Sequence, residues 1–118
     1  MNIESFREYC LSFKGVTEEL PFGPNTLVFK VLGKMFALTG LDNSDFRFNI
    51  KCDPDYAIEL REKYEGVIPG YHMNKQLWNT IIPDESISES LLKKWVKDSY
   101  TLVANSLPAS KRKELLDD

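Results

Sequence analysis

The segment FRFNIKCDP, residues 46–54, places apolar side chains at every second position and then ends in an aspartate and a proline. Its two phenylalanines, isoleucine and cysteine alternate with polar or cationic residues, which is the pattern of a strand with one buried and one solvent-exposed face. Asp53 and Pro54 suit the N-cap and the first residue of a helix. The segment therefore predicts a strand over residues 46–52 that leads directly into a helix.

Further strands are predicted on both sides of this segment. Residues 27–32 and 35–39 are rich in Val, Leu and Phe, and Gly33-Lys34 separates them as a tight turn, which indicates a β-hairpin. Residues 76–82 are expected to form a fourth strand. Strands joined by short turns are antiparallel neighbours, so these segments predict an antiparallel sheet.

Apolar positions spaced by three and four residues predict helices at both ends of the chain and between the third and fourth strands. The predicted order of elements is α-β-β-β-α-β-α-α, with the helices covering the apolar face of the sheet. We therefore expect an α+β protein, a two-layer sandwich formed by one domain over residues 1–118. The helices are expected between Asn2 and Gly15, between Asp53 and Gly66, through Leu92–Ser106 and over Ala109–Leu116.

Composition excludes several functional classes. The chain has 118 residues, is 42% hydrophobic and 28% charged, and carries a net charge of −3, so its surface as a whole does not attract nucleic acid. No apolar run approaches the roughly 20 residues that span a bilayer, so no membrane partner is expected. The N-terminal residues interleave acidic and apolar side chains, unlike a secretion signal. A cytoplasmic location is therefore expected, with Cys10 and Cys52 reduced.

The sequence offers little for catalysis. His72 is the only histidine, and neither cysteine lies near it in the sequence, although proximity in the fold stays open. A nucleophilic Cys52-His72 pair would also need a third group to orient it. No glycine-rich phosphate loop and no metal-ligand spacing is present. We therefore expect a non-enzymatic protein with no cofactor and no metal site.

The segment PGYHMNKQLWN, residues 69–79, groups side chains that recognise ligands. Tyr71 and Trp78 offer aromatic faces, and His72 and Lys75 offer donors or positive charge, which favours stacking on planar groups with contacts to phosphate. The alternative is structural: Trp78 belongs to the core, Tyr71 buries its ring, and His72 caps a turn. Both interpretations stay open at this point.

A second candidate binding surface is the solvent-exposed face of the strand over residues 46–52. Arg47 and Lys51, joined by Lys30 and Lys34, form a cationic surface, or else they protect a sheet edge and keep the protein soluble. Acidic and basic residues balance between residues 27 and 80. A basic patch in this region therefore requires that the two signs be separated in space.

Three stretches together resemble the MmcQ/YjbR family. They are VFKVLGKMF at residues 28–36, NIKCDP at residues 49–54, and PGYHMNK at residues 69–75 leading to Trp78-Asn79. The resemblance implies a fold similar to bacterial frataxin and a DNA-binding function. The family usually has a basic residue or histidine just before the tryptophan, where this chain has Leu77. The positions that match the family pattern are Lys34, Lys51, His72, Lys75, Trp78 and Asn79.

Two functions are therefore expected for the same residues. In the first, the chain is a DNA-binding domain whose three lysines contact phosphates, while the other side chains stack on bases or enter a groove. The phosphate contacts are Lys34, Lys51 and Lys75, and the others are His72, Trp78 and Asn79. In the second, the chain is an adaptor that holds a protein partner or a small anionic ligand in the same cleft. The two differ in whether DNA affinity depends on the lysines.

Overall fold

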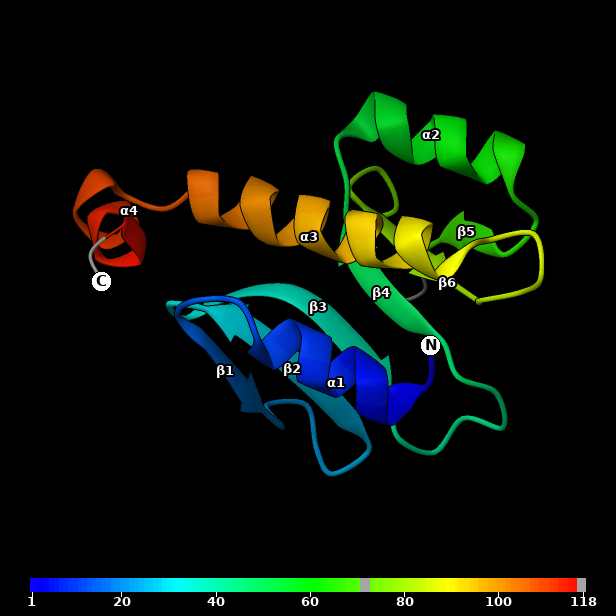
Figure 1. Ribbon diagram of the computed structural model, residues 1–118, viewed down its shortest axis with the longest axis horizontal. Coiled ribbons are helices and arrows are strands. Elements are labelled where there is room, and N and C mark those ends of the chain that lie inside the picture. The colour runs from blue at the N-terminus through cyan, green and yellow to red at the C-terminus, as the bar shows by residue number, and fades with distance from the viewer. Residues whose placement is uncertain (71–72, 117–118) are drawn as a thin grey trace.

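A six-stranded antiparallel sheet forms one layer of the computed structural model, and helices form the other (Figure 1). The structure describes residues 1–70 and 73–116. The predicted α+β class, an antiparallel sheet backed by helices, is confirmed. The strands are β1 (Val16–Glu19), β2 (Thr26–Val31), β3 (Lys34–Gly40), β4 (Phe48–Lys51), β5 (Val67–Pro69) and β6 (Trp78–Ile81), in the spatial order β1-β2-β3-β4-β6-β5. The helices are α1 (Ile3–Leu11), α2 (Pro54–Lys63), α3 (Glu89–Asn105) and α4 (Ala109–Leu116).

The predicted hairpin is formed by β2 and β3, with its turn one residue earlier than expected. Leu32 and Gly33 both have positive φ angles, 45° and 90°, and Val31 pairs directly with Lys34. Two left-handed residues match the twist of the flanking strands, and glycine adopts this conformation without steric cost. Lys34 is therefore the first residue of β3 and not part of the turn.

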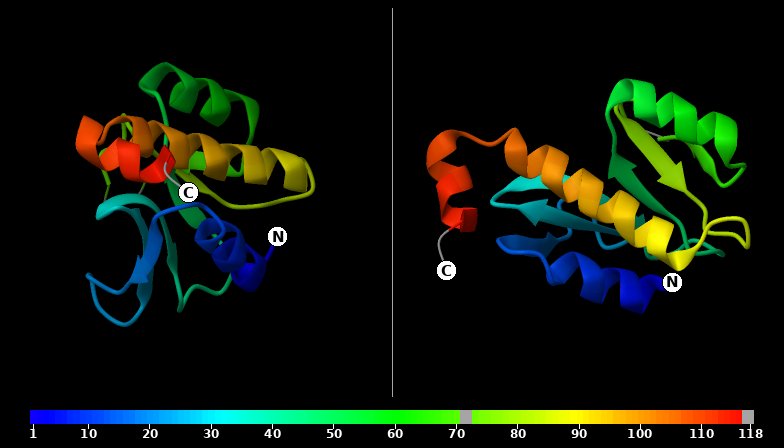
Figure 2. Two further views of the ribbon diagram at one scale, coloured as in Figure 1. Left: turned by 60° about the vertical axis from the view of Figure 1, so that its left-hand side comes forward. Right: turned by 45° about the horizontal axis from the view of Figure 1, so that its top comes forward.

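The core lies between the sheet and the helices that cover one of its faces (Figure 2). Phe6 of α1 stacks on Phe48 of β4 with ring centroids 4.6 Å apart, and it meets Phe29 of β2 edge-on at 5.6 Å. The longest helix, α3, contributes Trp95 and Val103 to the same core. Residues of β2 and β4 that alternate with the core residues face the side of the sheet without helices.

A buried serine of α3 joins β3 to β4 where their pairing stops. The ladder between these strands runs only as far as the pair Ala37 and Ile50. Beyond it, Ser99 Oγ donates to the Phe36 carbonyl oxygen at 2.6 Å and accepts from the Lys51 N–H at 2.8 Å. The hydroxyl thus satisfies both backbone groups and fixes the end of β4, which carries Lys51.

Two strands were missing from the expected order. The expected order has no strand before residue 27, but β1 occupies residues 16–19 and pairs with β2. It also has no strand between the helix that ends at Gly66 and residue 76, but residues 67–69 pair with β6 as β5. Both are short edge strands, and one is half acidic while the other ends in proline, so neither has the apolar alternation that identifies a strand.

No helix within the described residues is long and apolar enough to cross a membrane.

Candidate nucleic-acid interface

The described members of the predicted site all lie at one end of the sheet. Lys34 begins β3, Lys51 ends β4, and Trp78 and Asn79 begin β6. Lys51 and Trp78 are direct register partners, and Lys75 lies in the turn that precedes β6. His72 falls outside the described residues. The topology therefore brings these segments together, although they are far apart in the sequence.

The two β6 residues do not form an exposed recognition surface. Trp78 is only 7% exposed and packs against Val28 and Leu38 on the face of the sheet without helices. Met73 and Leu77 also contact this cluster. Asn79, with its side chain on the opposite face, is fully buried. The expected stacking platform and groove contact are therefore replaced by structural roles, because both side chains already have partners within the fold.

An arginine of α2 anchors the turn before β6. Arg61 of α2 donates from Nε to Asn79 Oδ1 at 2.6 Å, and from Nη2 to the carbonyl oxygens of Lys75 and Trp78. Asn79 Nδ2 in turn donates to the Ala57 carbonyl oxygen at 3.2 Å. Hydrogen bonds to a charged donor are roughly twice as strong as neutral ones. Arg61 and Asn79 therefore form a clamp that ties α2 to β6.

The clamp holds an exposed polar turn. Asn74, Lys75 and Gln76 are exposed, and the Asn74 carbonyl oxygen accepts from the Trp78 N–H at 2.9 Å. The Asn74 side-chain oxygen accepts from the Gln76 N–H at 3.0 Å. A lysine between two amide side chains, on a turn fixed by backbone bonds, suits contact with phosphate oxygens.

Further cations gather at the β2–β3 turn. Lys34 Nζ donates to Ser106 Oγ at 2.8 Å, just after the end of α3, and Lys111 Nζ donates to the Leu32 carbonyl oxygen at 3.4 Å. Lys14 lies beside this turn, because the Leu32 N–H donates to the carbonyl oxygen of the neighbouring Gly15. The β2–β3 turn and the ends of α3 and α4 therefore present several ammonium groups near each other.

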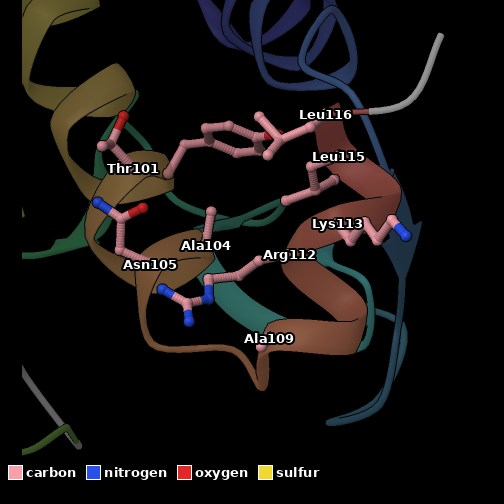
Figure 3. A pocket seen from close by; sticks show the side chains of 9 residues that line it. Thr101, Ala104, Asn105, Ala109, Arg112, Lys113, Leu115 and Leu116 are labelled. Atoms are coloured by element: carbon pink, nitrogen blue, oxygen red, sulfur yellow. The ribbon is translucent and has the colours of Figure 1, made fainter.

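Helix α4 extends the same cationic region. A groove of about 520 Å³ separates it from α3, with an apolar floor that includes Ala104 and Leu115. Arg112 reaches across the groove toward Asn105, whereas Lys113 points away from it (Figure 3). We call this part of the molecule the basic end. Its basic residues are Lys14, Lys34, Lys51, Lys75, Lys111, Arg112 and Lys113, and its acidic residues are Asp53, Asp55, Asp98 and Glu114.

The opposite end of the sheet is acidic. The β3–β4 loop carries Asp42 and Asp45, the latter paired with Arg47. Glu65, Asp84 and Glu85 line one shallow surface beside the end of α2, together with Lys63. We call this the acidic end. Within the described residues the charges are thus separated along the strand direction, so the net charge of −3 does not describe either end.

The cysteines have little nucleophilic character. Burial raises the pKa of the Cys52 thiol to about 11, an effect that Arg61 partly offsets and that the carboxylates of Asp98 and Asp53 reinforce. Burial also raises the pKa of Cys10 strongly. Both are therefore protonated thiols at neutral pH. Within the described residues, no group of three or more His, Cys, Asp or Glu side chains is placed to hold a metal ion.

Comparison with known proteins gives one family. A model of the YjbR family matches residues 11–102. The uncharacterized protein YbdF of Escherichia coli O157:H7 is 39% identical over 95 residues, which are 80% of this chain and 78% of that protein. The uncharacterized protein YjbR of Escherichia coli strain K12 is 29% identical over 116 residues, 98% of each chain.

Two solved structures share the fold. The Deinococcus radiodurans protein DR2400 superposes with a TM-score of 0.90 at 35% identity, covering 99% of this chain and 89% of that one. A Pseudomonas syringae protein superposes with a TM-score of 0.73 at 25% identity, covering 86% of this chain and 98% of that one. The likeness to bacterial frataxin stays a prediction.

Proposed function

This chain belongs to the YjbR family, and we propose that it is a small, non-enzymatic, cytoplasmic DNA-binding protein whose basic end contacts backbone phosphates. The observation that supports the proposal is the separation of charge between the two ends of the sheet. A protein with an acidic net charge can bind a polyanion through one basic region, because salt screens charges farther away than about 10 Å at 0.1 M.

Three lysines are proposed to contact phosphates. Lys34 and Lys51 belong to strands, and Lys75 belongs to a turn held by Arg61, so each ammonium group projects from an ordered backbone. Contacts to phosphate position a protein on the duplex and carry no sequence information. We therefore propose binding with little sequence preference. Trp78 and Asn79 act in this proposal by fixing β6 and its turn, and not by touching a base.

The test is a fluorescence-anisotropy titration of a labelled DNA duplex at 50 and 200 mM salt. Each neutralised phosphate contributes about −0.9 to the slope of log affinity against log salt. Three lysine contacts give a slope of about −2.7, so the fourfold rise in salt weakens binding about 40-fold. In the double variant Lys51→Ala/Lys75→Ala the slope falls to about −0.9, and the same rise weakens binding only about fourfold.

The matched control is Lys63→Ala, which removes the same charge near the acidic end and should leave affinity and slope unchanged. Absence of binding at 50 mM salt, or binding that does not respond to salt, contradicts the proposal. Equal loss of affinity in the control and in the double variant also contradicts it, because the effect would then come from net charge and not from the basic end.

A protein partner is the second candidate, and one observation favours it. Phe22, at the tip of the β1–β2 loop, is 66% exposed, and Leu20 in the same loop is also exposed. Exposed aromatic side chains are frequent anchors of protein interfaces. If no DNA binding is found, Phe22→Ser should abolish capture of a partner that Lys51→Ala does not affect, which separates the two functions.

A further inference from the structure

The groove between α3 and α4 leaves apolar side chains uncovered (Figure 3). Its volume of about 520 Å³ lies within the range of about 300–1,000 Å³ that is usual for small-molecule sites. Leu116, at one side of the groove, is 83% exposed. Apolar side chains that gather in one open groove favour an interaction site over a merely solvated surface. The apolar lining residues are Tyr100, Ala104, Ala109, Leu115 and Leu116.

The groove is part of the fold, because the chain is anchored on both sides of it. Leu107, in the turn between α3 and α4, is 6% exposed and belongs to the core. Near the end of α4, Leu115 packs over Gly15, where an added Cβ would lie only 2.7 Å from Leu115 Cδ2. No residue of α4 itself is buried. Both ends of α4 are thus fixed, while the space between it and α3 stays open.

One charged group enters the groove without a partner. The Arg112 side chain reaches across the groove toward Asn105, whereas the neighbouring Lys113 points away (Figure 3). Within residues 1–70 and 73–116, the Arg112 guanidinium makes no ion pair and no hydrogen bond. None of the described residues that line the groove is acidic. The groove therefore offers a single positive charge that no carboxylate of its lining neutralises.

From this arrangement we propose that the groove binds a fatty acid. Its carboxylate accepts two parallel hydrogen bonds from the Arg112 guanidinium, and its aliphatic chain lies against Ala104 and Leu116. A carboxylate matches the groove better than a phosphate dianion does, because only one cationic group faces the ligand. The inference does not depend on DNA binding, since none of the three lysines proposed to contact phosphates lines the groove.

The test is a chemical-shift titration of the isotope-labelled protein by NMR, with octanoate, octanol and octylamine as probes. The three probes share one aliphatic chain and differ in the head group. Octanoate should shift the backbone signals of Ala104, Asn105 and Leu116 in a saturable manner. It should also bind about tenfold more tightly than octanol, because hydrogen bonds between charged groups are stronger than neutral ones. Octylamine should bind more weakly than octanol, since the guanidinium repels its ammonium group.

Two pairs of variants separate binding in the groove from binding elsewhere. Arg112→Gln should weaken octanoate binding about tenfold and leave octanol binding unchanged. Lys113→Gln is the matched control, because it removes the same charge from the next residue of α4, whose side chain points away from the groove (Figure 3). Ala109→Trp blocks the groove from an exposed position and should weaken both probes. Ser110→Trp, at the next exposed position and outside the lining, should weaken neither.

Four results would overturn the proposal. The first is the absence of saturable shifts with octanoate. The second is an equal loss of octanoate affinity in Arg112→Gln and Lys113→Gln, because the attraction would then come from net charge. The third is octanol binding as tight as that of octanoate, which would make the occupant a neutral apolar molecule. The fourth is unchanged octanoate affinity in Ala109→Trp, which would place the binding site outside the groove.

Discussion

The clamp between α2 and β6 predicts that Arg61→Met is one of the most destabilising substitutions of a partly exposed residue in this protein. Methionine keeps an apolar stem but cannot donate to Asn79 Oδ1 or to the carbonyl oxygens of Lys75 and Trp78. Asn79 is fully buried, so its side-chain oxygen loses its partner without gaining water. A buried acceptor left unpaired costs about 1–3 kcal/mol, and a hydrogen bond to a charged group contributes about 1.5–3 kcal/mol.

Because the Lys75 carbonyl belongs to an exposed turn, water replaces part of what is lost there. We therefore expect the free energy of unfolding to fall by about 3 kcal/mol, somewhat less than the sum of the separate bonds. In a domain of this size such a loss lowers the melting temperature by about 12 °C. Urea denaturation followed by circular dichroism measures the free energy, and a thermal melt measures the temperature.

Lys63→Met is the control, since it makes the same kind of substitution at an exposed position of the same helix, and it should cost less than about 0.5 kcal/mol. A double-mutant cycle with Asn79→Leu should give a coupling energy above about 1.5 kcal/mol, because the two side chains bond directly. If Arg61→Met costs less than about 1 kcal/mol, or the coupling is near zero, the clamp does not hold α2 against the sheet.

Three further predictions follow from other parts of the fold. Ser99→Ala should lower the free energy of unfolding by about 2 kcal/mol in urea denaturation, because two backbone groups at the end of the β3–β4 ladder lose their partner; a cost near zero would show that these groups find other partners. With a pKa near 11, Cys52 is only about 0.1% thiolate at pH 8, so a thiol reagent should modify it at an appreciable rate only in urea; rapid modification of the native protein would contradict this. Glu18 has a pKa below its usual value because Arg7 donates a hydrogen bond to it. The ionised Glu18 therefore adds to the free energy of unfolding above the ordinary glutamate pKa of 4.5, and this stabilisation is lost as the pH falls through the lowered pKa of the folded state. Wild type should therefore be more stable than Glu18→Gln at pH 7, with the difference vanishing in acid; a difference that stays constant with pH would exclude the ion pair as its cause.

Periodicity predicted the elements that have a strongly apolar face. The hairpin of β2 and β3 and the helices α1 to α3 follow from apolar spacing, because burial of those positions against one another determines the arrangement. The edge strands β1 and β5 were missed because their stability comes from backbone pairing with a neighbour and not from their own side chains. The spacing of residues within a segment does not indicate which other strand will pair with it.

The site was only partly predictable for a related reason. The strand order brings the segments that carry Lys34, Lys51 and Lys75 to one end of the sheet. Arg61 has acidic and basic neighbours on α2, a pattern typical of a solvent-exposed helix face. Its partner Asn79 is eighteen residues away, and only the packing of α2 on β6 brings the two together. No local pattern indicates a contact of that kind.

The separation of charge gives the molecule an electric dipole with a direction. Helix α3 lies along the longest axis, which measures 39 Å, and it connects the acidic end to the basic end (Figure 1). At physiological ionic strength electrostatic forces decay over about 8 Å, so a polyanion senses only the end that approaches it. A molecule that arrives with its acidic loops forward is repelled and rotates before contact, so productive encounters begin with one orientation already selected.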